Sequence, residues 1–203
     1  MMLIGVGLGP GDKELLTLKA VRILRSADAV FVPGRMAREL VNDYCEPVVL
    51  EFPMVNDEEM IREALERNAE IIAPAAMEGT AVLGILGDPN FYSTFSRQTD
   101  ILRSMYPEIE VRVEPGISSI TAFASRLQVP VNSGFTVTDG SDEECLVMLK
   151  VRSPRKIMDR LRSSGYSQFH LVEKMFLDGE RVYHGDDIPE RCDYMSVMFA
   201  RRA

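Results

Sequence analysis

Apolar and polar positions alternate on two different scales along the first half of the chain. Short apolar stretches, typical of strands, are separated by longer stretches in which apolar residues recur every three or four positions, as in helices. The stretch at residues 81–86 is almost uninterrupted, as expected of a strand covered on both faces. This alternation predicts a parallel sheet with helices on both sides. The predicted strands cover residues 2–6, 29–32, 48–52, 81–86 and 110–113, and the predicted helices cover residues 17–27, 58–72 and 94–105.

Local signals mark several ends of these elements. Thr17 stands where an N-cap hydroxyl accepts an early backbone N–H of the first helix. The second helix begins at Glu58 with acidic residues in its first turn, where they complement the helix dipole. Pro74 is expected to stop or kink this helix, because proline has no N–H donor. The pair Pro33 and Gly34 is expected to end the second strand.

The second half of the chain has more closely spaced strands. After residues 115–116 the pattern changes, and closely spaced strands indicate a more antiparallel, mixed sheet. We therefore expect an α/β fold of two domains, residues 1–115 and 116–203, with a mainly parallel first sheet and a mixed second one. The predicted elements here are helices at residues 119–127 and 154–163 and strands at 135–138, 146–151, 170–174, 181–184 and 195–200.

Composition narrows the class of protein. The 203 residues carry a formal net charge of -8, which disfavours a general nucleic-acid binder. The three cysteines form no CxxC pair, and only two histidines are present, His170 and His184, so we predict neither a disulfide framework nor a metal site. No apolar run reaches the length of a membrane span, and no signal peptide is recognisable at the N-terminus. We expect a cytoplasmic protein.

A glycine-rich segment follows the first predicted strand. It reads Gly-Val-Gly-Leu-Gly-Pro-Gly-Asp at residues 5–12. A dinucleotide fingerprint would need a third glycine where Pro10 or Asp12 stands, and an acidic residue after the second strand, which is absent. A P-loop would need a following Gly-Lys-Ser/Thr. Pro10 stiffens the loop and removes a donor, which suits an apolar wall better than a phosphate cradle. A tight turn without any ligand stays an alternative.

Two further loops are expected at the same edge of the sheet. Gly-Asp-Pro at residues 87–89 follows the strand at 81–86, and Ser118 and Ser119 follow the next strand. Ligands of parallel α/β sheets gather at the carboxyl ends of strands. Asp88 is either a ligand contact or a turn residue. The serines either contact a ligand or cap the following helix. Three loops at one edge favour a binding site over isolated turns.

The three segments together resemble the motifs of the tetrapyrrole methyltransferases. The resemblance lies in residues 7–20, in Gly-Asp-Pro at 87–89 and in Pro-Gly-Ile-Ser-Ser at 115–119, in the family's order and at its separations. It covers essentially the whole chain. Within the family, residues 29–34, 51–54 and 87–95 look most like the enzymes that methylate C-20 of precorrin-2 or cobalt-factor II.

This resemblance implies two αβα domains with S-adenosylmethionine in a cleft between them, a tetrapyrrole substrate and a homodimer. Carried over position by position, it implies a set of cofactor contacts in three loops of the first domain and at two strand ends of the second. These are Pro10, then Leu86, Gly87, Asp88 and Phe91, then Ser118 and Ser119, and finally Leu149 or Lys150 and Met175.

A polycarboxylate substrate needs local cations in an acidic protein. The candidates that follow predicted strands or loops are Arg35, Arg38, Arg97 and Arg126, and each is equally well explained as a solvated surface residue. Tyr92 is a further candidate for substrate binding. Glu173 or Tyr92 is available as a general base, but a methyl transfer from a sulfonium does not require one, so no catalytic residue is assigned.

Other functions remain open on the sequence. A sibling tetrapyrrole methylase acting on another ring carbon would carry the same motifs. A methylase of the same fold acting on a protein or an RNA is a second alternative, and a non-enzymatic protein that kept the cofactor site is a third.

Overall fold

The computed structural model describes residues 1–202 and divides the chain into two compact units, Met1–Phe135 and Thr136–Ala203. None of the helices in residues 1–202 is both long and apolar enough to span a membrane. The division falls later than the predicted boundary at residue 115, because the segment that follows the fifth strand remains bonded to the first unit through Gly116.

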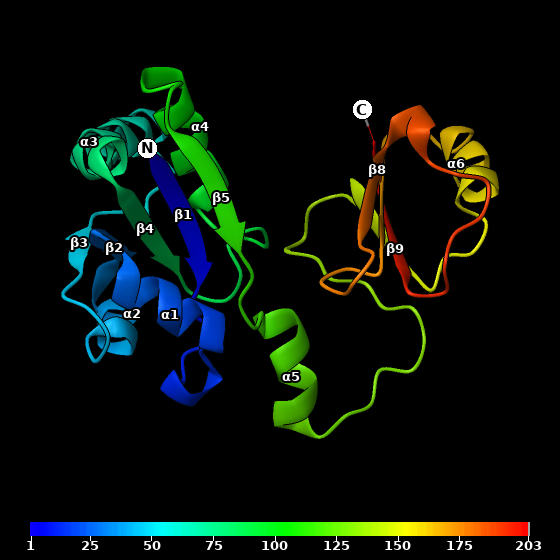
Figure 1. Ribbon diagram of the computed structural model, residues 1–203, viewed down its shortest axis with the longest axis horizontal. Coiled ribbons are helices and arrows are strands. Elements are labelled where there is room, and N and C mark those ends of the chain that lie inside the picture. The colour runs from blue at the N-terminus through cyan, green and yellow to red at the C-terminus, as the bar shows by residue number, and fades with distance from the viewer. Residues whose placement is uncertain (203) are drawn as a thin grey trace. The chain divides into compact units, whose positions relative to one another are not determined.

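The first unit contains one sheet in which every paired strand is parallel. Its strand order is β3-β2-β4-β1-β5, as Figure 1 shows. This confirms the mainly parallel first sheet. The strands are β1 (Met2–Gly7), β2 (Ala29–Pro33), β3 (Val48–Leu50), β4 (Thr80–Ile85) and β5 (Glu110–Glu114).

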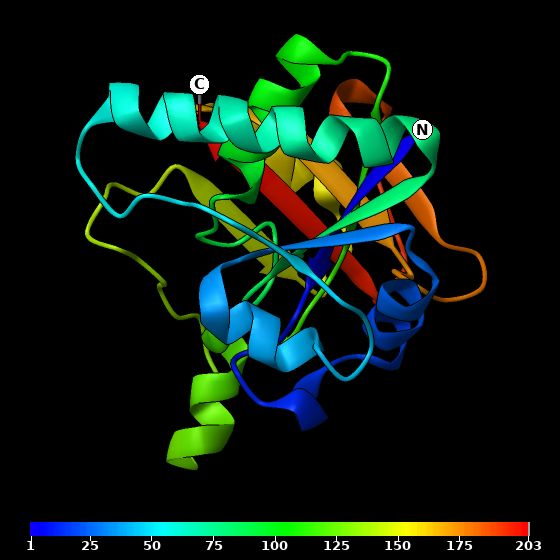
Figure 2. The ribbon, with the colours of Figure 1, turned by 90° about the vertical axis from the view of Figure 1, so that its left-hand side faces the viewer.

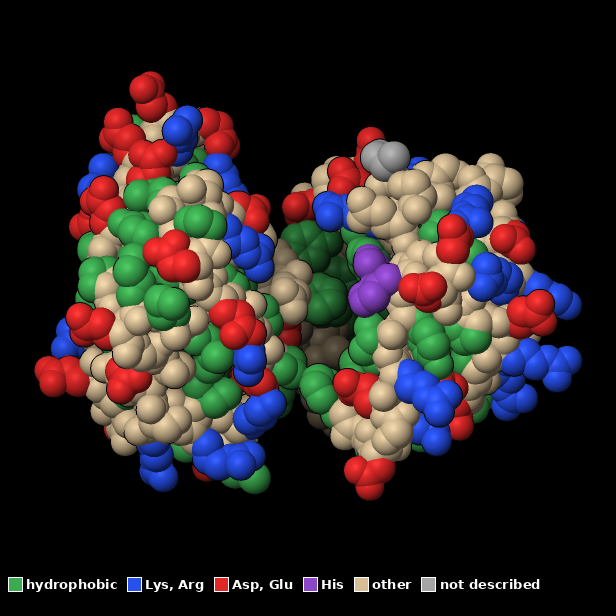
Figure 3. Space-filling view, turned by 45° about the horizontal axis from the view of Figure 1, so that its top comes forward, with side chains coloured by type: hydrophobic (Ala, Val, Ile, Leu, Met, Phe, Trp, Pro, Cys, Tyr) green, Lys and Arg blue, Asp and Glu red, His purple; other side chains and the backbone are tan. Residues whose placement is uncertain are grey.

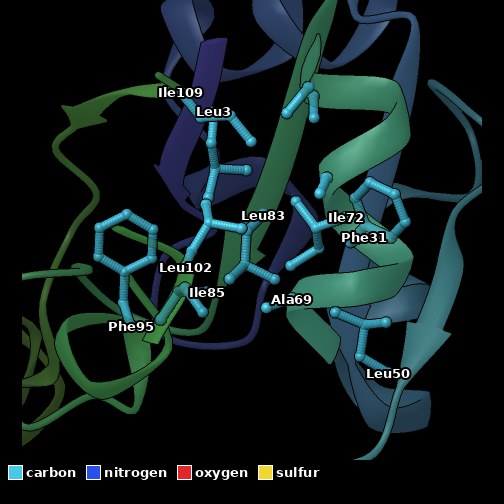
Figure 4. Packing of buried hydrophobic residues seen from close by; sticks show 13 residues of the cluster. Leu3, Phe31, Leu50, Ala69, Ile72, Leu83, Ile85, Phe95, Leu102 and Ile109 are labelled. Atoms are coloured by element: carbon cyan, nitrogen blue, oxygen red, sulfur yellow. The ribbon is translucent and has the colours of Figure 1, made fainter. Parts of the chain in front are cut away.

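Helices cover both faces of this sheet. On one face α1 (Leu18–Ser26) and α2 (Gly34–Val41) pack against Val30, Val32 and Val82. On the other face α3 (Glu58–Glu78) and α4 (Phe95–Met105) pack against Leu3, Leu83 and Ile85. Figure 4 shows this second core, into which α3 contributes Ala69 and Ile72 and α4 contributes Phe95 and Leu102. The sheet is thus the buried middle layer, as the uninterrupted apolar strand predicted.

Two helices differ from the prediction. Helix α2 was not predicted, because Pro33 and Gly34 were interpreted only as a break. Gly34 has φ +84° and opens the helix, and the buried side chains Ala37 and Leu40 hold it on the sheet. Helix α3 does not stop at Pro74 but continues to Glu78. Ala73 and Ala76 on either side of the proline are buried in the core, so packing outweighs the missing hydrogen bond.

Capping side chains begin several of the helices, as was predicted for Thr17. The Thr17 hydroxyl accepts the N–H of Ala20 at 3.0 Å, and the Asp57 carboxylate accepts the N–H groups of Glu59 and Met60. The last helix of the first unit, α5 (Ser119–Leu127), begins with the Ser118 hydroxyl, which accepts the N–H of Ile120 at 3.2 Å. These bonds satisfy N–H groups that have no partner within the helix. Before α1 lies a short 3-10 turn, η1 (Lys13–Leu15).

The second unit is built on an antiparallel sheet of order β6-β9-β7-β8. Every pairing in it is antiparallel, so the expectation of a mixed sheet was wrong. Residues 135–138, which were predicted to be a strand, do not form one. The connection from β7 to β8 is too short for the crossover that parallel strands need, so these two strands pair antiparallel. Its elements are β6 (Cys145–Leu149), α6 (Pro154–Arg162), β7 (Tyr166–Glu173), β8 (Arg181–His184), η2 (Gly185–Asp187) and β9 (Ser196–Arg202).

One face of this sheet is packed and carries the core of the unit. Met158 of α6 is fully buried against Phe169 and Met198. On β7 and β8, His170 and His184 are cross-strand partners whose Nδ1 atoms lie 2.7 Å apart. This hydrogen bond satisfies one nitrogen of each ring. Figure 3 shows histidine side chains as one purple group on the surface.

Candidate functional site

Three loops leave the first sheet at one edge because the three strands before them are neighbours. In the order β4-β1-β5, Gly7 pairs with Ile85 and Val6 pairs with Glu114. The strands therefore end at nearly the same level, and their loops begin side by side. The first loop follows β1, the second follows β4, and the third follows β5. The sequence predicted this shared edge correctly.

The first and second loops are hydrogen-bonded to each other. Gly87 N–H donates to the carbonyl of Gly9 at 2.7 Å, and Gly9 N–H donates back to the carbonyl of Gly87 at 3.3 Å. Both residues lie in the left-handed region, with φ +75° at Gly9 and +71° at Gly87, where a side chain is strained. The glycines at these two positions therefore allow a backbone bridge that fixes one loop against the other.

The second and third loops are joined by Asp88. This side chain is only 7% exposed, and its Oδ1 accepts the N–H of Asn90 at 2.9 Å within its own turn. Its Oδ2 accepts the N–H of Gly116 at 3.1 Å in the third loop. The turn role that the sequence left open is therefore present, and the same carboxylate also fixes the position of the third loop.

The three loops approach so closely that two glycines have no room for a side chain. A Cβ on Gly7 would overlap the backbone of Gly116, and a Cβ on Gly116 would overlap the carbonyl oxygen of Gly87. A Cβ on Gly87, by contrast, meets nothing within 4 Å. The backbone of Gly87 is therefore packed on one side and open on the other, as a surface that receives a ligand requires.

Apolar side chains stand exposed around this junction. Leu86 is 37% exposed and Phe91 is 51% exposed, and Pro10 is also exposed in the first loop. Ser118 uses its oxygen as a helix cap, which leaves its hydroxyl hydrogen available to donate, and Ser119 is exposed beside it. Exposed apolar groups beside a few polar ones are the usual lining of a small-molecule site.

The second-unit candidates lie at the end of the sheet where β6 and β7 finish. Leu149 and Met175 are exposed there, and Lys150 has a left-handed backbone with φ +58°. The Lys150 ammonium lies 5.8 Å from the centre of the Tyr194 ring. Sequence reasoning missed Tyr194, which stands in no motif and is brought to this end only by its place before β9.

Comparison with known proteins identifies the chain's relatives. The family model "Tetrapyrrole (Corrin/Porphyrin) Methylases" matches residues 2–186. The chain belongs to this family. It is 31% identical over 222 aligned positions to the probable cobalt-precorrin-2 C(20)-methyltransferase of Methanocaldococcus jannaschii, covering 98% of this chain and 95% of that one. It is 30% identical to the precorrin-2 C(20)-methyltransferase of a Sinorhizobium species, covering 80% and 79%.

A solved structure supports the fold of this tetrapyrrole methylase. A putative cobalamin synthesis related protein (CobF) from Corynebacterium diphtheriae aligns with a TM-score of 0.55 at 17% identity. The alignment covers 99% of this chain and 98% of that one. At this identity the likeness concerns the fold alone.

The arginines predicted for substrate binding differ in their surroundings within the tetrapyrrole methylase. Arg35 pairs with Glu39 on α2 at 3.0 Å, and Arg97 pairs with Glu58 of α3. These pairs are exposed, so they stabilise little and cost little to open. Arg38 and Arg126 are exposed on α2 and α5. Tyr92, also exposed, follows the Gly-Asp-Pro turn with φ +48°.

Glu173, one of two groups considered as a general base, is held by its own surroundings. One of its oxygens accepts the backbone N–H of Asp193, and the other accepts the Tyr183 hydroxyl at 3.4 Å. A carboxylate that fixes neighbouring backbone is poorly placed to exchange protons with a substrate. The geometry therefore gives no support to Glu173 as a base in this methylase.

Proposed function

We propose that this protein transfers the methyl group of S-adenosylmethionine to C-20 of precorrin-2 or cobalt-factor II in corrinoid biosynthesis. The observation that carries the proposal is the interlocked junction of Gly9, Gly87, Asp88 and Gly116 in a member of the tetrapyrrole methylase family. The choice of C-20 rests on two relatives that bear that activity in their names and align over most of their length.

The chemical groups at the junction are of the types that could bind S-adenosylmethionine. Exposed Pro10, Leu86 and Phe91 offer apolar surface to an adenosine, which is flat and largely apolar on its faces. The open side of Gly87 admits close approach of a ligand to the backbone. The hydroxyls of Ser118 and Ser119 are donors for an amino acid carboxylate near a helix start.

We further propose that Asp88 acts at this site mainly by holding Gly116, and that the second unit adds contacts from Met175 and from Leu149 or Lys150. When bound, S-adenosylmethionine supplies an electrophilic methyl group whose departing thioether is neutral and needs no proton. The chain's task is then to orient substrate and cofactor and to exclude water. Orientation of this kind can contribute roughly 7–11 kcal/mol.

The substrate is a polycarboxylate, so we propose that exposed cations guide it. The cations proposed for this on the first unit are Arg35, Arg38, Arg97 and Arg126, and Tyr92 is a further candidate for substrate binding. Arg35 and Arg97 would exchange their exposed acidic partners for a substrate carboxylate at small cost. We also propose, from the family resemblance, that the protein is a homodimer, and, from the sequence, that it works in the cytoplasm.

Product analysis tests the function directly. The protein is incubated with S-adenosylmethionine carrying a ¹³C-methyl group and with precorrin-2 or cobalt-factor II, and the new methyl carbon is located by NMR. We expect the label at C-20. Label at another ring carbon would show that the protein is a tetrapyrrole methylase acting at that carbon. Cofactor binding without transfer to any tetrapyrrole would refute the substrate.

A further inference from the structure

One end of the second unit's sheet combines exposed apolar side chains with cations. The end is formed where β6 and β7 finish and β9 begins, and Lys174 N–H donates to the carbonyl of Met195 there at 2.8 Å. Tyr194 is 47% exposed between two cations, with the Lys150 ammonium 5.8 Å and the Arg152 guanidinium carbon 5.2 Å from its ring centre. Leu149 and Met195 are exposed beside it.

Two acids at this end, Asp193 and Glu173, already have partners within the unit. Asp193 Oδ1 accepts the N–H of Met195 at 2.9 Å, and its Oδ2 lies 3.9 Å from the ammonium of Lys174. Both oxygens of Glu173 are engaged as described above. Within residues 1–202, neither Lys150 nor Arg152 has an acidic partner within 4.0 Å, whereas Arg162 and Arg201 of the same unit do. The charge offered outward is therefore positive.

The backbone at Lys150 is held in a conformation that favours glycine. A φ of +58° costs a residue with a Cβ of order 1–3 kcal/mol, and such residues gather at functional sites. Glycine would relieve this cost but would remove the ammonium that lies over Tyr194. The lysine side chain at this position therefore needs a reason other than stability.

We propose that Lys150 and Arg152, held at Tyr194, bind carboxylate side chains of the tetrapyrrole substrate. A flat apolar ring bordered by carboxylates matches an apolar surface bordered by cations, and Arg binds carboxylates with two parallel hydrogen bonds. This inference rests on the proposed function and sharpens it. It assigns Lys150 to substrate binding, so that Leu149 is the proposed cofactor contact of the two.

The test is a double variant, Lys150→Gln with Arg152→Gln, measured for two ligands separately. We expect the Kd for cobalt-factor II to rise about tenfold, with weaker dependence on salt, while the Kd for S-adenosylmethionine stays unchanged. The matched control is Lys156→Gln with Arg160→Gln, which removes the same charge from exposed positions of α6 and should leave both affinities unchanged. In turnover, the KM for the tetrapyrrole should rise more than kcat falls.

Further variants keep the test decisive. Lys150→Gly suits the local backbone, so it should fold at least as stably as the wild type and still bind cobalt-factor II more weakly. Tyr194→Phe keeps the ring and should bind normally, whereas Tyr194→Leu should not. Unchanged cobalt-factor II affinity in the double variant would overturn this inference alone. Loss of S-adenosylmethionine affinity in the double variant would show that Lys150 contacts the cofactor and not the substrate. A wild type that binds no tetrapyrrole would overturn the proposed function as well.

Discussion

Gly116 donates its backbone N–H to Oδ2 of Asp88 at 3.1 Å, and this bond joins loops that follow two different strands. The acceptor follows β4 and the donor follows β5, and the two strands lie on opposite sides of β1 in the sheet. The other oxygen of Asp88 already closes its own turn on Asn90. One buried carboxylate therefore fixes both the shape of the second loop and the position of the third.

Removing this carboxylate should loosen the proposed cofactor site more than the fold. Asp88→Ala leaves the N–H groups of Asn90 and Gly116 without their acceptor, and hydrogen bonds to a charged group are worth about 1.5–3 kcal/mol. We expect S-adenosylmethionine affinity to fall about tenfold or more while the protein stays folded. Calorimetric titration and a thermal melt measure the two effects. Asp88→Asn, which keeps one acceptor oxygen, should lie between. Unchanged affinity in the alanine variant would show that Asp88 serves the turn alone.

The glycines of the junction should differ in their tolerance of a methyl group. Gly116→Ala places a Cβ against the Gly87 carbonyl, so it must push the loops apart. We expect it to destroy most of the cofactor affinity. Gly87→Ala meets open space and is strained only by its φ of +71°, so its effect on stability should be about 1 kcal/mol.

A glycine away from the junction provides the control for this pair. Gly34→Ala has a similar strain at φ +84° and also meets nothing within 4 Å. It should cost similar stability to Gly87→Ala without changing the affinity for S-adenosylmethionine. Equal cofactor affinity in the Gly116 and Gly34 variants would refute the idea that close backbone approach builds the site.

Much of the first unit could be predicted from the sequence because its signals are local. The apolar run at 81–86 and the cap at Thr17 each depend on neighbouring residues, and both are confirmed. Pro33 and Gly34 end β2 as predicted, but helix α2 after them and the continuation of α3 past Pro74 were not predicted, for the opposite reason. Their outcome depends on burial of Ala73, Ala76 and Ala37 in a core assembled from distant segments, which no local pattern reveals.

The candidate site was predictable in its parts but not in its connections. Strand order alone brings the three loops to one edge, and the motifs already indicated which loops matter. Two of these connections depend on the register between β4, β1 and β5. They are the bond between Asp88 and Gly116 and the close packing that leaves no room for a side chain at Gly7. Tyr194 lies in no recognisable motif, so its position beside Lys150 and Arg152 is visible only in the folded structure.

Gln98 offers a test of packing in the interior of the first unit. It is completely buried, its Nε2 donates to the carbonyl of Leu65 at 2.9 Å, and its Oε1 has no partner among residues 1–202. A buried acceptor without a partner costs about 1–3 kcal/mol. Gln98→Met should therefore be within about 1 kcal/mol of the wild type or more stable.

The matched comparison at this position is a truncation. Gln98→Ala also removes the unpartnered oxygen, but it leaves a cavity between α3 and α4 and should destabilise by about 2 kcal/mol or more. Denaturant unfolding of both variants measures the difference. A methionine variant as unstable as the alanine variant would mean that the hydrogen bond to Leu65 outweighs the unpartnered oxygen.

The three cysteines should react with a thiol reagent in a definite order. Cys145 is exposed at the start of β6, whereas Cys45 and Cys192 are partly buried. Burial raises the pKa of the Cys45 thiol, and burial is also the main reason that the pKa of Cys192 is raised. Only the thiolate reacts, so a raised pKa lowers the reactive fraction at any pH below it.

Iodoacetamide at pH 8 should therefore modify Cys145 first, and Cys145→Ser should abolish the fast phase. The rates at Cys45 and Cys192 should keep rising above the pH at which an ordinary thiol is fully ionised. Mass spectrometry of peptides assigns each rate, and modification of Cys192 before Cys145 would contradict the burial of that thiol.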